Sequence, residues 1–286
     1  MTNANFVDTV LPSIITEWAL PLASNQGDYW WACGTAVVVA PYLAITAKHV
    51  FNDHWHRQQG SPPGPTGANG DFSMIAFQAP ETGEPMLWAV RRIWPSAHTD
   101  IAFLKLTPWN ESAAKHIWRW LTLNLLPPPV GTRISAFGYH ASTIAKRKPV
   151  RWTHQASTSY GRVEEVFEQQ RDRVRLDFQC FSVDAQFEGG MSGGPVFNDA
   201  GEVCGLICSS IPPVPPESTH TSYVTTLWPA MGAVLDLDRQ GHEPSSYPAI
   251  ELARGGHIVA RNWEHVEVGF SETGACTVSL RPKSAG

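Results

Sequence analysis

The chain has 286 residues, 43% of them hydrophobic, and a formal net charge of −5 at pH 7. This length fits about two globular units of roughly 150 residues each, which can bury a core without disulfide support. Because the charge is mildly acidic and no long basic run occurs, we expect no nucleic acid and no membrane among the partners.

The cysteine pattern points to a reducing environment. The five cysteines are Cys33, Cys180, Cys204, Cys208 and Cys276. An odd, sparse set is not typical of a disulfide framework, so we expect buried free thiols. Residues 1–22 lack a basic segment followed by an apolar core, and no apolar run is long enough to span a bilayer. These features predict a cytoplasmic protein.

The first part of the chain predicts a helical arm followed by a β unit. Apolar residues between 6 and 22 recur at three- and four-residue spacing, which predicts an amphipathic helix within an arm at 1–28. Residues 29–51 then predict a strand, a turn and a second strand that deliver His49. Asp100 opens the apolar strand that follows it, and three prolines at 127–129 mark a linker. We therefore place a first β unit at 29–126.

The second part predicts another β unit at 127–239. Its predicted strands lie at 131–140, 158–166, 173–183, 203–209 and 222–225, and a terminal helix is predicted at 227–237. Residues 240–286 predict a β extension with short strands at 249–252, 257–260, 265–268 and 276–280. This extension either forms an added β subdomain or docks on the rest of the chain. Structural cover is favoured for it over a partner-binding role.

The stretch from Phe187 to Val196 holds a serine, Ser192, between two glycine pairs. Glycine before the serine allows backbone conformations that other residues avoid. The N–H groups of Gly190 and Ser192 are then free to converge on a developing oxyanion. Gly193 and Gly194 are expected to keep the hydroxyl uncrowded. The alternative is a glycine-rich hairpin with a chance serine.

Two further residues complete a catalytic pattern. A serine hydroxyl is inert unless a base takes its proton; His49 is suited to be that base, and Asp100 to orient its imidazole. In the order His, Asp, Ser, the motifs Thr46–Val50, Asp100–Leu104 and Gly190–Pro195 resemble those of the chymotrypsin-like (trypsin-like) serine protease family, in its intracellular bacterial or viral form. The resemblance covers about residues 30–235.

The resemblance implies an all-β fold of two six-stranded antiparallel Greek-key barrels. It places the active site between them, with His49 and Asp100 from the first barrel and Ser192 from the second. It also implies hydrolysis of protein or peptide substrates through an acyl-enzyme, with no metal and no other cofactor.

The resemblance also implies a substrate pocket. Its candidate residues are Gln186 and Phe187 at the base, Cys208, Ser209 and Ser210 along one wall, and Thr221 at the mouth. Gln186 carries no charge and Thr221 narrows the pocket, so we expect a small or medium uncharged P1 residue. Asp184 and Glu188 would support a basic P1 residue if the alignment were shifted by two positions.

Met191 stands where digestive members of the family carry the aspartate that pairs with a new amino terminus. We therefore predict no such activation switch. Constitutive activity, an activating protein partner and loop ordering stay open as means of control, and a regulated processing protease is the favoured role.

The sequence disfavours two other function classes. A catalytically silent binding module would have lost a member of the triad, and none is lost. A metal-dependent enzyme would need a compact cluster of ligand residues, which the spacing of the sequence does not provide.

Overall fold

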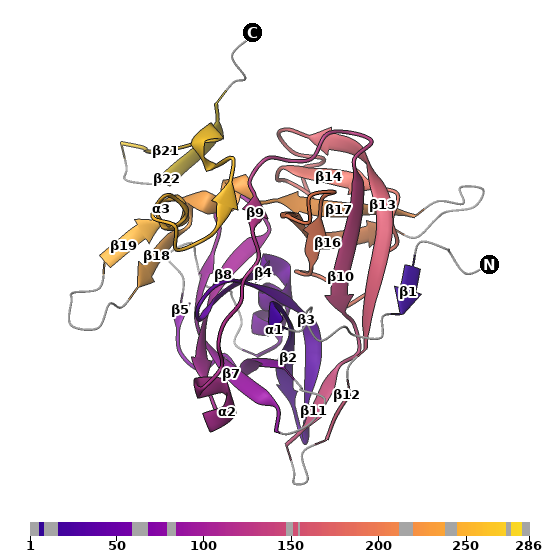
Figure 1. Cartoon of the computed structure of the whole chain (residues 1–286), viewed down its shortest axis with the longest axis vertical. Helices are drawn as coiled ribbons and strands as arrows, with labels where there is room; N and C mark the ends of the chain where they lie inside the picture. The colour runs from indigo at the N-terminus through magenta and orange to yellow at the C-terminus, as the bar shows by residue number, and fades with distance from the viewer. Residues whose placement is uncertain are drawn as a thin grey trace.

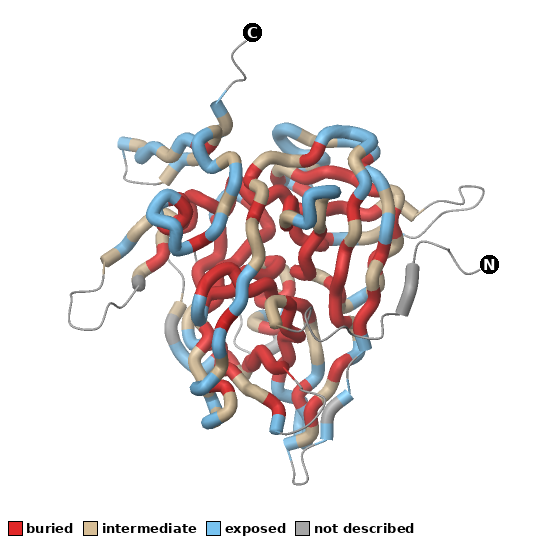
Figure 2. Tube along the Cα trace, in the orientation of Figure 1, coloured by how far each residue is buried: buried red, intermediate tan, exposed pale blue. Residues whose placement is uncertain are grey.

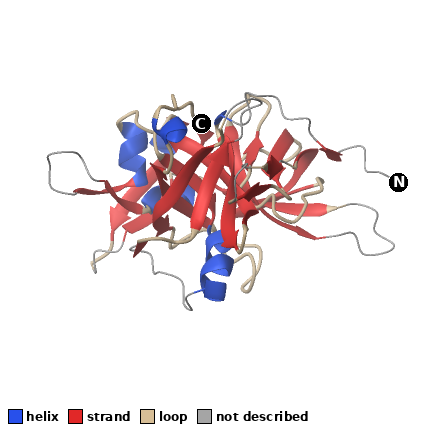
Figure 3. Ribbon diagram, turned by 90° about the horizontal axis from the view of Figure 1, so that it is seen from below, coloured by secondary structure: helices blue, strands red, loops and turns tan. Residues whose placement is uncertain are grey.

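The computed structural model describes residues 6–8, 17–58, 68–78, 84–146, 151–153, 155–211, 220–237, 245–272 and 276–281. Strands dominate the fold, and helices are few and short (Figure 3). The strands close into two six-stranded antiparallel barrels, which lie against each other (Figure 1). The predicted all-β, two-barrel fold is confirmed.

The first barrel follows the ring order β3-β2-β6-β7-β8-β4 and closes through the pairing of β3 with β4. Its strands are β2 (Ala19–Gln26), β3 (Tyr29–Ala40), β4 (Leu43–Ala47), β6 (Met74–Gln78), β7 (Met86–Pro95) and β8 (Ile101–Pro108). All five residues of β4 are buried. A tight turn with Tyr42 at φ 61° joins β3 to β4. This hairpin leads directly into helix α1 (Lys48–Gln58).

The second barrel follows the ring order β10-β13-β14-β17-β16-β15 and closes through β15 and β10. Its strands are β10 (Arg133–Tyr139), β13 (Ala156–Phe167), β14 (Cys180–Val183), β15 (Pro195–Phe197), β16 (Val203–Ile211) and β17 (Thr221–Thr226). Smaller elements surround the barrels: β5 (Ala68–Asn69), α2 (Glu111–Ala114), β9 (Leu123–Asn124), β11 (Thr143–Ala145) and β12 (Trp152–Thr153). Strand β11 pairs with β3, so a segment between two strands of the second barrel extends the sheet of the first.

The predicted amphipathic helix at residues 6–22 is wrong at both ends. Strand β1 (Phe6–Asp8) pairs with β13, and β2 begins at Ala19 between β3 and β6. Residues 9–16 lie outside the described residues. The first six residues of β2 are all buried. A strand buried on both faces has no polar alternation, and its apolar spacing therefore does not distinguish it from a helix.

The predicted terminal helix at 227–237 is also wrong. A 3-10 helix (Trp228–Gly232) is followed by strand β18 (Val234–Leu237). Pro229 lies in the first turn of this helix, and Gly232 packs so closely on Val278 that a Cβ atom at Gly232 would collide with it. Both features fit a short helix that stops against the C-terminal extension.

The extension contains a helix as well as strands. Its elements are β19 (Ser245–Pro248), which pairs with β18, then α3 (Ala249–Arg254), β20 (Ala260–Arg261), a 3-10 turn at Trp263–His265, β21 (Val266–Phe270) and β22 (Cys276–Leu280). Residues 249–252, predicted as a strand, belong to α3, and only Ala260 of the strand predicted at 257–260 lies in a strand. The predictions at 265–268 and 276–280 agree with the hairpin of β21 and β22.

Six apolar clusters form the core of the described residues, and three of them are large (Figure 2 shows the buried segments). One lies inside each barrel, and a third joins strands of both barrels to the extension. Ile250 of α3 is fully buried in this third cluster beside residues such as Trp94 and Leu206. The Trp94 indole Nε1 donates at 3.1 Å to Oδ1 of Asp236 on β18, the strand that pairs with β19 of the extension. The extension therefore docks on the barrels.

All five cysteines are free thiols, as predicted; Cys180, Cys204 and Cys208 are buried, whereas Cys33 and Cys276 are half-buried. Cys204 and Cys208 share strand β16. Among the helices of the described residues, none has the length and apolar character needed to cross a membrane.

Candidate active site

His49 lies at the start of helix α1, where the first backbone N–H groups of a helix have no partner within the helix. Asp100, which precedes β8, supplies those partners. The backbone N–H of Lys48 donates to the Asp100 carbonyl oxygen at 3.0 Å, and the backbone N–H of His49 donates to Asp100 Oδ1 at 2.9 Å. A negative group at a helix N-terminus is favourable, so Asp100 fixes the helix that carries His49.

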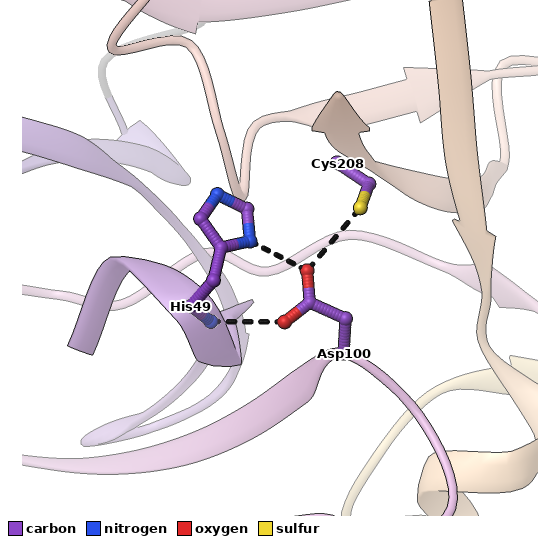
Figure 4. A group of neighbouring side chains, drawn as sticks. All are labelled: His49, Asp100 and Cys208. Carbon is purple, nitrogen blue, oxygen red and sulfur yellow. Dashed lines mark hydrogen bonds and ion pairs between the residues drawn. The ribbon is translucent and has the colours of Figure 1, made fainter. Parts of the chain in front are cut away.

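The His49 side chain bonds the same carboxylate. Its Nδ1 lies 2.6 Å from Asp100 Oδ2 (Figure 4). Because a carboxylate only accepts hydrogen bonds, Nδ1 carries the proton and the Nε2 lone pair is left to act as a base. The Asp100 side chain is only 7% exposed, whereas that of His49 is 36% exposed. The imidazole is thus bonded to a buried carboxylate through Nδ1, while the His49 side chain as a whole stays partly exposed to solvent.

The pKa of His49 is raised above its usual 6.5. Burial acts to lower it, but the hydrogen bond and charge of Asp100, together with the charge of Asp53, outweigh burial. Asp100 therefore stabilises the protonated imidazole, which is the form that a general base reaches after taking a proton.

Cys208 is a third donor to Asp100. Its thiol donates to Asp100 Oδ2 at 3.3 Å (Figure 4). The pairing of β16 with β17 shifts register between Ile207 and Ser209, so Cys208 lies at a bulge, a feature that re-aims a side chain. Burial, and next the charge of Asp100, raise the pKa of Cys208 well above 9.0. The thiol therefore stays protonated. Sequence reasoning assigned Cys208 to a pocket wall and missed this contact, for which the sequence carries no signal.

The three side chains also form a candidate metal-binding group. One donor atom from each of His49, Asp100 and Cys208 lies within 4.8 Å of the others. The spacing along the sequence predicted no such cluster, because the fold brings these residues together from three separate elements.

The loop before Ser192 contains a tight turn from Glu188 to Met191. The Met191 N–H donates to the Glu188 carbonyl at 3.1 Å, and Gly190, the third residue, has φ 100°. A positive φ at this position, with none at Gly189 before it, is the pattern of a type II turn. Among the described residues, neither the N–H of Gly190 nor that of Ser192 is engaged in a hydrogen bond. Both predicted oxyanion donors are therefore available.

The serine loop is fastened to the first barrel. The Thr35 N–H donates to the Ser192 carbonyl at 2.8 Å, and the Thr46 hydroxyl donates to the Thr35 carbonyl at 2.7 Å. Gly193 has φ 82°, and a Cβ atom on it would collide with Thr46 Oγ1 and the Thr35 carbonyl oxygen. A Cβ on Gly194 would collide with backbone in β10. Close packing thus requires both glycines, Gly193 against the first barrel and Gly194 against β10 within the second barrel.

Ser192 and His49 lie on opposite sides of one contact between the barrels. An added Cβ at Gly34 would lie 2.6 Å from Val50 Cγ1, next to His49, and 3.1 Å from the Ser192 carbonyl oxygen. Ser192 is half-buried, and in the described part of the chain its hydroxyl makes no hydrogen bond to His49. Such bonds are often long in unliganded enzymes and tighten when substrate binds.

The predicted pocket residues divide between two places. Cys208, Ser209 and Ser210 follow one another on β16, and Thr221 pairs with Ile211 at the start of β17. The Ser210 hydroxyl accepts a bond from that of Ser222 at 2.9 Å.

Gln186 and Phe187 instead lie in the loop before Ser192. The Gln186 amide donates to Glu188 Oε1 at 2.6 Å. Phe187 is buried in the apolar cluster of the second barrel together with Met191, so its ring contributes to the core there.

A comparison with family models matches residues 34–206 to the trypsin-like peptidase domain. Among solved structures, the chain is similar to the Rv3671c protease from M. tuberculosis in its active form, with 18% identity, a TM-score of 0.47 and coverage of 78% of this chain and 82% of that chain. The inactive form of the Rv3671c protease gives 18% identity, a TM-score of 0.47 and coverage of 77% and 89%. No curated protein matches the sequence.

The matched segment contains His49, Asp100 and Ser192 and spans more than half of the chain. The chain therefore belongs to the trypsin-like peptidase family and is a serine protease.

Proposed function

We propose that this protease is an endopeptidase that cleaves proteins with a triad of Ser192, His49 and Asp100. The observation that carries the proposal is the double attachment of His49 to Asp100, through Nδ1 at 2.6 Å and through the backbone N–H at 2.9 Å. This arrangement leaves Nε2 as a base directed away from the carboxylate.

In the proposed reaction, Ser192 Oγ attacks the scissile carbonyl carbon while His49 Nε2 takes the hydroxyl proton. Asp100 stabilises the resulting imidazolium. The oxyanion of the tetrahedral intermediate accepts hydrogen bonds from the Gly190 and Ser192 N–H groups. The intermediate then collapses as His49 protonates the leaving amine, which leaves an acyl-enzyme. Water, activated by His49 in the same way, releases the acid and restores Ser192.

For the substrate, we propose a small or medium uncharged P1 residue. The Gln186 amide is bonded to Glu188, which supports a pocket base without a free acid at that position. Peptides that differ only in P1 as Ala, Val, Leu, Arg or Glu test this. A strong preference for Arg would reject it.

For its control, we propose a processing protease of the cytoplasm that needs no amino-terminal activation. Met191 is fully buried, and its thioether accepts a bond from the Glu188 N–H at 3.3 Å. An apolar residue so placed offers no counter-ion for a new terminal amine. The type II turn at Gly190 also supports an oxyanion site that is formed without cleavage. If a new terminal amine caused a large rise in activity, this proposal would be wrong.

The first experiment is labelling with a fluorophosphonate probe, with wild type beside Ser192→Ala. Such probes react with nucleophilic serines, so we expect labelling of wild type only. If folded wild type stays unlabelled, the measurement is repeated with candidate protein partners. Labelling that appears with a partner means a regulated protease. A chain that is never labelled is a binding module, and the proposed function is then rejected.

A further inference from the structure

Two protons at the candidate active site converge on one oxygen atom. The His49 Nδ1–H and the Cys208 thiol both donate to Asp100 Oδ2, at 2.6 Å and 3.3 Å. We propose that His49, Asp100 and Cys208 form a binding site for Zn²⁺, and that occupation of this site inhibits the protease. The inhibition, though not the binding, rests on the proposed function.

The donor set is one that zinc prefers. Zn²⁺ binds thiolate sulfur at about 2.3 Å, imidazole nitrogen at about 2.0–2.1 Å and carboxylate oxygen at about 2.0–2.2 Å, in tetrahedral geometry. Around such an ion, neighbouring donor atoms are about 3.3–3.6 Å apart. The Sγ to Oδ2 distance of 3.3 Å lies at the lower edge of this range, whereas the Nδ1 to Oδ2 distance of 2.6 Å must lengthen by about 0.7 Å to admit the ion. The three donor atoms lie within 4.8 Å of one another, so side-chain shifts of about 1 Å complete the site, and a water molecule can fill the fourth position.

The charges of the site balance those of the ion. Bound Zn²⁺ carries two positive charges, and the Cys208 thiolate and Asp100 carboxylate supply two negative ones. A buried charge is tolerated only when it is paired, and both Asp100 and Cys208 are buried. Nδ1 faces the buried Asp100, so the ion enters when the imidazole of His49, the partly exposed side chain of the three, swings aside.

Binding would release one proton and move another. The Cys208 thiol loses its proton to solvent as the Zn–S bond forms. His49 stays neutral, but Nδ1 gives its lone pair to zinc and the imidazole proton is carried on Nε2 instead. Because Nε2 is then protonated, it cannot take the proton of Ser192. Zinc would thus inhibit by fixing the wrong tautomer of the general base.

The same chemistry excludes the common hard cations. Mg²⁺ and Ca²⁺ require six or more oxygen ligands, and this group supplies one carboxylate, one nitrogen and one sulfur. The site should therefore bind Zn²⁺ in preference to Mg²⁺ and Ca²⁺, because thiolate is a ligand that suits zinc and not the hard cations.

Direct binding is tested on the full-length Ser192→Ala variant, which cannot cleave itself. Co²⁺ replaces Zn²⁺ as a spectroscopic probe, because a cobalt–thiolate bond gives a charge-transfer absorption. We expect this absorption to saturate at one ion per chain, to disappear on adding Zn²⁺, and to be absent when Cys208→Ser is added. Cys276→Ser, which removes a half-buried thiol elsewhere, is the matched control and should keep the absorption. No absorption, or an equal one with Cys208→Ser, overturns the inference.

Inhibition is tested by the rate of fluorophosphonate labelling, with each variant compared with its own metal-free rate. Zn²⁺ should slow labelling of wild type, and a chelator should restore it, whereas Mg²⁺ should have no effect. With Cys208→Ser, the Zn²⁺ concentration that halves the labelling rate should rise at least about tenfold. Loss of a group that only hydrogen-bonds a metal ligand already costs about tenfold in metal affinity. Equal inhibition of both proteins would place the zinc effect elsewhere. If wild type is never labelled, the proposed function has failed, but the cobalt measurement still decides whether the site exists.

Discussion

Gly190→Ala is the most direct test of the oxyanion site. Gly190 has φ 100°, a conformation that costs a residue with a side chain about 1–2 kcal/mol. An added Cβ would also lie 2.9 Å from the His140 carbonyl oxygen and 3.0 Å from the His140 Cα atom, and neither backbone atom moves easily. Both effects oppose the type II turn.

The turn can relieve this strain by rotating the peptide between Gly189 and residue 190. That rotation turns the N–H of residue 190 away from the site. Loss of one oxyanion donor typically costs about 10²–10³ in kcat. We therefore expect Gly190→Ala to lower kcat by about two to three orders of magnitude, with a smaller effect on KM. Peptide hydrolysis and the rate of fluorophosphonate labelling measure this, and thermal unfolding verifies that the variant is folded.

Gly189→Ala is the matched control. Gly189 has no positive φ, and an added Cβ there meets no atom within 4 Å. The two variants thus add the same methyl group to neighbouring residues of one turn. Gly189→Ala should keep activity within a few-fold of wild type. If a folded Gly190→Ala enzyme is as active as wild type, the N–H of residue 190 is not an oxyanion donor and the reasoning fails.

Three further predictions follow from the site and from the contact between the barrels. Because the pKa of His49 is raised above 6.5, the acid limb of the kcat/KM profile should lie above pH 6.5. Asp100→Asn should move this limb to lower pH and should lower kcat by about 10⁴-fold. An unmoved limb would mean that Asp100 does not set the pKa of His49. His49→Ala in a Ser192→Ala background should cause almost no further loss of peptide hydrolysis, since triad residues act as a unit; additive losses would contradict the triad. Tyr139→Phe removes a buried hydrogen bond between the barrels, which the Tyr139 hydroxyl donates to the Ala19 carbonyl at 3.1 Å. The variant should lower the free energy of unfolding, measured in urea, by about 0.5–1.5 kcal/mol. No change would show that water replaces the bond.

The sequence predicted the parts of the molecule that are determined by local chemistry. The catalytic pattern was recognisable because His49, Asp100 and Ser192 each lie in a short motif whose neighbours serve the same purpose. The glycines around Ser192 are an example, but the sequence did not show that Gly193 also accommodates the first barrel, because Thr35 and Thr46 are remote from it in sequence.

The helix errors have a physical cause. Strand β2 lies between β3 and β6 with its first six residues buried, so it shows no polar face from which a strand could be recognised. The segment predicted as a terminal helix contains Pro229 and packs on Val278 of the extension. In both places tertiary contacts override the local pattern of apolar residues.

Asp100 shows why the rest of the candidate site could not be predicted from the sequence. Its carboxylate accepts three hydrogen bonds, two from His49 on α1 and one from Cys208 on β16. These donors come from different barrels, so the position of Asp100 depends on how the barrels are packed against each other. No pattern within β16 indicates that Cys208 faces Asp100, because a bulge that forms only against β17 directs it there. A change that loosens the apolar cluster between the barrels should therefore disturb the Cys208–Asp100 contact, which joins the two barrels, before it unfolds either barrel.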